Sequence, residues 1–214
     1  MDAEDIIDIN GEPRKLGTLA VSDALTRCTL PVYADKGPMF SKADLLKFAR
    51  ENDTRGRSRF DPSWIKDQKS HGSCNGFAEA AALSRARVRR GLARVDLSGA
   101  YAYSLMNGGR DNGSVLVDGM NNCQERGVAT ADTVPWNAIY PSQYDRVKAD
   151  AEAKRFRAWE CYVLSTELEY FSALAAGFDV VQAVHVGGTF QRLNSQGIAG
   201  ADRGPGNHST DRKS

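Results

Sequence analysis

The feature that most constrains this chain is a helical pattern that begins at a cysteine. From Cys74 onward, small and apolar side chains recur at steps of three and four residues, the spacing of one helix face. They are Phe77, Ala80, Ala81, Ser84 and Val88. Gly91 then supplies a residue type that commonly ends a helix. The pattern predicts a buried central helix that starts at Cys74.

Other segments carry helix and strand signals in a definite order. Helices are expected over residues 41–49, 97–106, 115–126 and 166–176, followed by a β-branched strand over 180–186. Because the helices precede the strand, we predict an α+β protein with a helical lobe and a sheet lobe. Residues 1–40 mix charge, glycine and proline without periodicity, so they are expected to form an irregular arm.

Charge and composition bear on the classes of partner to expect. The chain has 214 residues, enough for one domain or two small lobes that share a cleft. Its 28 basic and 27 acidic residues leave a net charge of +1, which gives no reason to expect nucleic acid or a membrane surface as partner. Four arginines near residues 85–90 suit the negative end of the helix dipole and are interpreted as a solvated face.

The chain's first residues and its cysteines bear on location and metal content. The acidic start M-D-A-E-D-I-I-D lacks the features of a secretory signal, and no apolar run is long enough to span a membrane. The four cysteines are widely spaced, so neither structural zinc nor a disulfide framework is expected, and no cofactor is predicted. We therefore expect a reducing, cytoplasmic setting in a microbial or virus-infected cell.

The position of Cys74 has a chemical consequence. A cysteine in the first turn of a helix meets the positive end of the dipole and free backbone N–H groups, which favour the nucleophilic thiolate. Gln68, six residues upstream, could donate its side-chain amide to a developing oxyanion, with the Cys74 N–H as second donor. The alternative is that Cys74 simply packs, as most free cysteines do.

The segment around Cys74 resembles a known family. D-Q-K-S-H-G-S-C-N-G-F-A is similar to D-Q-G-x-C-G-S-C-W-A-F, the nucleophile segment of papain-like (C1-type) cysteine peptidases. The matching residues are Asp67, Gln68, Gly72, Ser73, Cys74 and Phe77. Asn75 stands where the family has tryptophan.

Later segments follow in the family's order, so that the resemblance covers about residues 60–208. Residues 97–98 resemble the start of the second helix, and 111–114 the glycine-bearing strand that pairs with substrate. Residues 126–136 and 204–208 resemble the family's G-V…P-aromatic stretch and the approach to the catalytic histidine. His208 follows Cys74 at the separation typical of this class, about 130–150 residues.

The resemblance implies a two-lobe α+β fold, with a helical lobe that holds the nucleophile helix and an antiparallel β lobe. It divides the chain into an N-terminal extension, residues 1–55, and a peptidase domain, residues 56–214. It implies hydrolysis of a polypeptide through a Cys74 acyl-enzyme, with His208 as base and then acid and Gln68 in the oxyanion hole. Gly113 and Ser114 would bind the substrate backbone. His185 is instead interpreted as a satisfied residue of the strand.

The sequence also departs from the family. After His208 it reads S-T-D-R-K-S, without the family's closing strands or the asparagine that orients the histidine. We therefore expect an incomplete β lobe and weak or no activity. A non-catalytic binding module and a Cys–His acyltransferase remain alternatives, and the oligomeric state is open. Residues 1–55 are expected to be a plain extension, although they could pack over the cleft.

A second departure concerns a disulfide. The family has half-cystines at the positions of His71 and Asp111. Because both are replaced together, we predict that His71 and Asp111 lie side by side, linked by a hydrogen bond. The alternative is that both side chains point into solvent.

Overall fold

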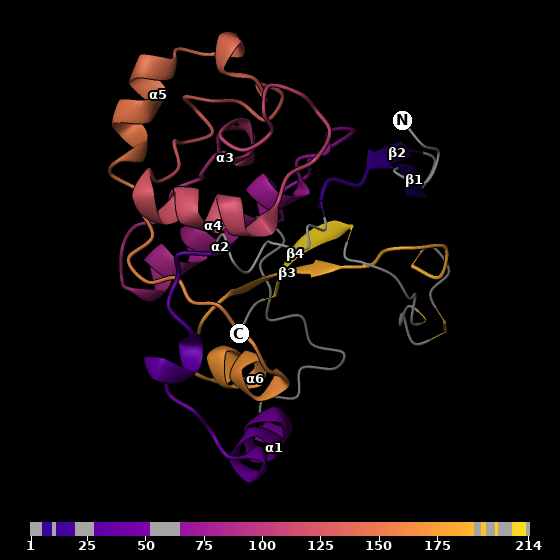
Figure 1. The fold of residues 1–214 in the computed structure, drawn as a ribbon, viewed down its shortest axis with the longest axis vertical. Helices are drawn as coiled ribbons and strands as arrows, with labels where there is room; N and C mark the ends of the chain where they lie inside the picture. The colour runs from indigo at the N-terminus through magenta and orange to yellow at the C-terminus, as the bar shows by residue number, and fades with distance from the viewer. Residues whose placement is uncertain are drawn as a thin grey trace.

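The computed structural model describes residues 6–9, 12–19, 28–51, 65–190, 194–195, 200 and 207–212. Four helices gather in one lobe, and a strand pair lies between them and a further pair of helices (Figure 1). The first group comprises α2 (Cys74–Arg89), α3 (Gly99–Ser104), α4 (Leu116–Glu125) and α5 (Arg146–Ala153). The second pair comprises α1 (Lys42–Glu51) and α6 (Glu167–Ala175). Two short 3₁₀ helices, Tyr33–Asp35 and Pro141–Gln143, complete the described helical elements.

The predicted helices form where the sequence supplies a start and a stop. Ser98 Oγ accepts a hydrogen bond from Tyr101 N at the start of α3, and Thr166 caps α6 in the same way. After α4 and α6 the chain reaches Gly127 and Gly177, which adopt φ of +84° and +93°. Glycine reaches this left-handed region without a steric penalty, so these positions end the helices. Sequence reasoning did not identify α5, which Asp145 caps.

The strand pair of the second lobe is antiparallel. β3 (Val180–Val184) pairs with β4 (His208–Arg212), and the register places Val184 opposite His208. No strand was predicted at residues 208–212, so β4 is a part of the incomplete β lobe that sequence reasoning did not identify. The polar sequence forms a strand because its backbone completes hydrogen bonds with β3 and because β4 packs on α2.

The N-terminal segment also contains regular structure. β1 (Ile6–Ile9) and β2 (Glu12–Lys15) form an antiparallel hairpin at the edge of the molecule (Figure 1). The irregular arm predicted for residues 1–40 is therefore wrong for these two strands. Beyond β2 the chain passes beside the first turn of α2, and residues 15–19 contact both lobes.

The main core lies between α2, α3 and the segments that follow them. It contains buried tyrosine, leucine, valine and alanine side chains, among them Ala80, Leu83, Leu97, Tyr101, Tyr103, Val134 and Ile139. A smaller core of Tyr33, Ala173 and Val180 supports the second lobe. The prediction of a buried helix beginning at Cys74 is confirmed, since its residues 74–84 are all buried. No helix in the described part of the chain is both long and apolar enough to cross a membrane.

Candidate active site

The packing of α2 against β4 brings Cys74 next to the segment that carries His208. Cys74 is the first residue of α2, and its side chain is only 1% exposed. The backbone N–H of Ser209 donates to Cys74 Sγ at 3.4 Å. His208 directly precedes this donor in β4, but its Nδ1 atom makes no hydrogen bond to the thiol.

The His208 side chain is partly buried. Burial lowers the pKa of its imidazole below the usual value near 6.5, because a charged ring loses hydration there. Its Nδ1 atom is buried and has no hydrogen-bond partner among the described residues. The imidazole is thus neutral near pH 7, and no side chain of the described region orients it through Nδ1.

Gln68 lies in the loop before α2 and uses its amide group to bind backbone. Its Nε2 donates to the carbonyl oxygen of Lys15 at 3.0 Å and to that of His71 at 2.8 Å. The neighbouring Lys69 adopts φ of +55°, which turns the chain sharply after Gln68. The amide therefore already holds a carbonyl of the chain's own N-terminal segment.

That segment, residues 15–19, occupies the candidate site as an extended strand. Ser114 N donates to Gly17 O at 2.7 Å, and Leu19 N donates to Ser114 O at 2.9 Å, which makes a parallel bridge. On the other side, Thr18 N donates to Asn207 O at 3.0 Å. Residues 15–19 therefore pack over the candidate site, so the expectation of a plain extension is wrong for this segment.

Thr18 lies directly over the thiol. Its Oγ1 is 3.4 Å from Cys74 Sγ and 2.6 Å from Ser209 Oγ, and it donates to Asn75 Oδ1 at 3.1 Å. Asn75 in turn donates through Nδ2 to the backbone oxygen and the hydroxyl of Ser114, at 2.8 and 2.9 Å. Ser209 Oγ also donates to Asn75 Oδ1. This network closes the thiol off from solvent.

Sequence reasoning missed Thr18, Asn75 and Ser209 as parts of the site. The sequence did contain a signal that Asn75 belongs to the site, because an amide stands there in place of a large apolar residue of the family pattern. Thr18 and Ser209 carried none, since their roles depend on contacts with residues more than fifty positions away.

The predicted contact between His71 and Asp111 is confirmed. His71 Nδ1 lies 3.4 Å from Asp111 Oδ2. The other oxygen, Oδ1, accepts from Gly72 N at 2.8 Å and from Tyr103 Oη at 2.9 Å. A carboxylate thus joins the loop before α2 to the segment before Ser114, at the two positions where papain-like peptidases have half-cystines. Gly113, which adopts φ of +84°, donates its N–H to the same Tyr103 Oη that donates to Asp111.

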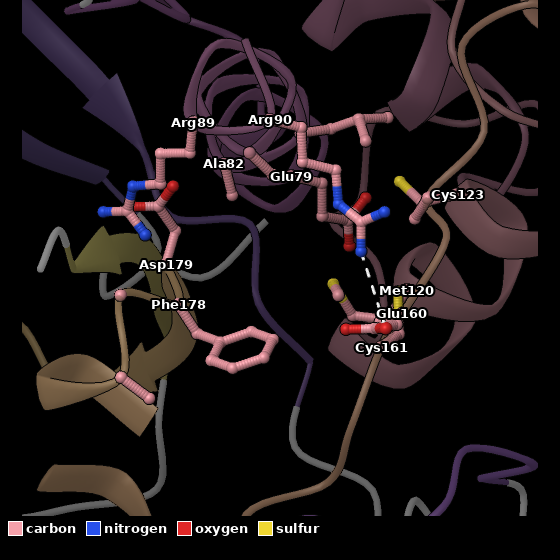
Figure 2. A pocket seen from close by; sticks show the side chains of 15 residues that line it. Glu79, Ala82, Arg89, Arg90, Met120, Cys123, Glu160, Cys161, Phe178 and Asp179 are labelled. Atoms are coloured by element: carbon pink, nitrogen blue, oxygen red, sulfur yellow. Dashed lines mark hydrogen bonds and ion pairs between the residues drawn. The ribbon is translucent and has the colours of Figure 1, made fainter. Parts of the chain in front are cut away.

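A separate cavity of about 210 Å³ lies beside the C-terminal half of α2 (Figure 2). Glu79 points into it from α2 and packs on Gly119 of α4. Both Glu79 carboxyl oxygens are buried without a hydrogen-bond partner among the described residues. Burial, with the nearby Asp118, raises the Glu79 pKa well above its usual value, which favours the neutral carboxyl group.

Two buried thiols also line this cavity. Burial raises the pKa of Cys161 to about 11 and raises that of Cys123 as well, so both remain protonated near neutral pH. All four cysteines of the chain are free thiols. Among the described residues, no group of three or more histidine, cysteine or acidic side chains is arranged to hold a metal ion.

Comparison with known proteins assigns the fold. No protein-family model matches the chain, and no curated protein matches it in sequence. Among solved structures, xylellain, a cysteine protease from Xylella fastidiosa, is similar at 16% identity and a TM-score of 0.63, over 96% of this chain and 81% of that one.

Two further solved structures are similar. Procathepsin B S9 from Trypanosoma congolense is 19% identical, with a TM-score of 0.55, over 92% of this chain and 68% of that one. The proform of the ragweed pollen cysteine protease Amb a 11 is also 19% identical, with a TM-score of 0.52, over 84% and 56% of the two chains. The chain thus has the α+β papain-like fold, which confirms the fold predicted from the sequence resemblance.

Proposed function

We propose that the protein is a cysteine peptidase that hydrolyses peptide bonds through Cys74. The observation that carries this proposal is that a peptide strand already lies across the thiol. Residues 15–19 are held through their backbone by Gln68, Ser114 and Asn207. Since backbone hydrogen bonds are common to all polypeptides, a groove that binds one strand in this way is suited to a polypeptide substrate.

In the proposed reaction, the neutral His208 imidazole accepts the Cys74 proton, and the thiolate attacks the substrate carbonyl carbon. Gln68 Nε2 and the Cys74 backbone N–H would donate to the oxyanion that forms. His208 then protonates the leaving amine, which leaves an acyl-enzyme. A water molecule, deprotonated by His208, releases the acid product. Gly113 and Ser114 would hold the substrate backbone along the cleft.

The same contacts suggest that the described state is a closed form. With Thr18 over the thiol and the Gln68 amide on Lys15 O, neither group can reach a substrate. Two of the similar structures are named as a procathepsin and a proform. We propose that residues 15–19 must leave the cleft before a substrate binds.

One observation favours a second candidate, a papain-like module that binds polypeptide without cleaving it. His208 Nδ1 lacks a partner among the described residues, and loss of the orienting group in a Ser-His-Asp site lowers kcat by about 10⁴-fold. A Cys–His acyltransferase would use the same first step and pass the acyl group to an amine.

A labelling experiment on the full chain separates these candidates. Gly17→Ala opens the cleft, since a methyl group there would overlap the Gly72 carbonyl oxygen. In this variant a peptide with an electrophilic carbonyl should modify Cys74, and His208→Ala should slow the modification. If Cys74 is modified at the same rate with and without His208, the peptidase and the acyltransferase are both ruled out, and the non-catalytic binding module is the candidate that stands. Product analysis with an added amine identifies an acyltransferase.

A further inference from the structure

We infer that Asp111 forms a subsite of the cleft that binds a basic side chain, so that the preferred ligands are peptides with a lysine or arginine. This inference rests on the proposed function for the use of the site, but the binding of a basic side chain can be tested without catalysis. It starts from Lys15, the residue of the bound strand whose carbonyl oxygen Gln68 holds.

The Lys15 side chain is bound closely by Asp111. Its Nζ donates to the backbone oxygen of Asp111 and lies 3.8 Å from the carboxylate Oδ2. The side chains of Lys15 and Asp111 are only 13% and 20% exposed, so the contact is largely removed from water. The Lys15 stem passes close to Gly72, because a Cβ built on Gly72 would lie 3.5 Å from Lys15 Cδ, an ordinary contact distance.

The carboxylate is oriented before the lysine arrives. Its Oδ1 is fixed by Gly72 N and Tyr103 Oη, two donors that belong to the framework of the cleft. Its Oδ2 is left facing His71 and Lys15. Because one oxygen positions the group and the other receives the cation, binding a lysine requires no rearrangement of the acid.

The alternative is that the pair only anchors the N-terminal segment. The position of Lys15 argues for a subsite, because its carbonyl oxygen and its side chain are held by two different groups of the cleft, Gln68 and Asp111. Neither contact depends on the residue being part of the same chain. A peptide from another molecule that presents lysine at this point meets the same two groups.

The test uses the full chain with Lys15→Met and Gly17→Ala, which removes the lysine and displaces the strand. The probes are peptides based on residues 12–19, with Arg14 replaced by alanine and with lysine, norleucine or glutamate at position 15. Affinity is measured by protection of Cys74 from alkylation, resolved by peptide mapping. We expect the lysine peptide to bind at least about tenfold more tightly than the norleucine peptide, the size of one charge-assisted contact.

Asp111→Asn in the same background should reduce that ratio below about threefold, while the exposed Asp132→Asn should leave it unchanged. Asparagine keeps an oxygen for Gly72 N and Tyr103 Oη, so the loop is expected to hold. If Asp111→Asn does not fold, the chain that retains Asp111 still decides whether the subsite exists, through the ratio of its affinities for the lysine and norleucine peptides. Equal affinities for these two peptides, or a lysine preference that survives Asp111→Asn, overturn the subsite.

Hydrolysis is followed in parallel with the same peptides and separates the two claims. Cleavage without a lysine preference overturns this inference and leaves the proposed function standing. A lysine preference in binding, with no peptide cleaved, supports the subsite and counts against the peptidase. Loss of both the preference and cleavage overturns both.

Discussion

At the scale of single residues, burial shifts the pKa of Glu79 in α2 and that of His208 in β4 in opposite directions. His208 is held neutral because its pKa is lowered, and Glu79 is held protonated because its pKa is raised. His208 directly precedes Ser209, which contacts Cys74, whereas Glu79 lines a cavity whose lining includes neither Cys74 nor His208. Each shift has a measurable consequence.

Replacing Glu79 with methionine should stabilise the protein at neutral pH. The folded state keeps this carboxyl protonated, whereas the unfolded state ionises it above about pH 4.5. The contribution of Glu79 to the free energy of unfolding is therefore fully present below that pH. It is lost as the pH rises toward the Glu79 pKa of the folded state. We expect Glu79→Met to raise the free energy of unfolding by about 1–3 kcal/mol at pH 7, and by less at pH 4.5.

Chemical denaturation at the two pH values measures this difference. Glu169 provides the control, because it is also buried but accepts from Ser165 N and Thr166 Oγ1. Glu169→Met should destabilise the protein. A Glu79→Met variant that is less stable than the native chain at pH 7 contradicts the account.

The lowered pKa of His208 predicts how the rate of Cys74 acylation falls at acid pH. As the proposed base, His208 must be neutral to accept the Cys74 proton, and burial favours the neutral ring to lower pH. In the Gly17→Ala chain, the rate of Cys74 acylation by an activated peptide ester should fall with a midpoint below pH 6.5. His185→Ala should not move this midpoint. If the acylation rate instead falls with a midpoint above pH 6.5, and His208→Ala removes this midpoint, a neighbouring charge raises the His208 pKa by more than burial lowers it.

At the scale of elements, the strand of residues 15–19 and the helix pair α2–α3 depend on glycines at close contacts. Gly17 packs against Gly72, and Gly76 of α2 packs against the start of α3. In both places a methyl group would overlap backbone atoms, which cannot move aside as a flexible side chain can. Alanine substitutions at Gly17 and Gly76 should nevertheless have different effects. Residues 15–19 can move out of the cleft while the domain stays folded, whereas α2 cannot separate from α3 without unfolding.

Gly17→Ala should expose Cys74 without unfolding the protein. We expect iodoacetamide to modify Cys74 at least about tenfold faster than in the native chain, where the thiol is almost fully covered. Mass spectrometry distinguishes Cys74 from the other three thiols. Leu19→Ala, at an exposed position of the same strand, should change the rate little. Equal rates for the native and Gly17→Ala chains would mean that the strand does not control access.

Gly76→Ala should destabilise the whole domain. Alanine normally stabilises a helix interior relative to glycine by about 0.5–1 kcal/mol. Here its methyl group would overlap Gly99 O and the backbone N of Tyr103, so we expect a loss of about 1–3 kcal/mol in the free energy of unfolding. Val88→Ala on the exposed part of the same helix should cost much less. A stabilising Gly76→Ala contradicts the α2–α3 contact.

At the scale of the whole molecule, the parts predicted from sequence are those set by local signals or by the family pattern. Ser98 and Thr166 mark helix starts through contacts three residues away, and the contact of His71 with Asp111 follows from two matched segments. β4 was missed because its polar sequence lacks an apolar alternation, and its pairing with β3 supplies the stability. The strand over Cys74 was missed because it is held mainly by backbone groups, which every residue possesses.

The central claim is that Cys74 is the nucleophile of a cleft that the chain's own N-terminal strand closes. The most direct measurement is the rate of peptide hydrolysis by the Gly17→Ala chain, compared with the native chain and with Gly17→Ala combined with Cys74→Ala. We predict slow but measurable hydrolysis in Gly17→Ala, less in the native chain, and none once Cys74 is removed. Hydrolysis that persists without Cys74, or its absence when alkylation proves the thiol accessible, would contradict the claim.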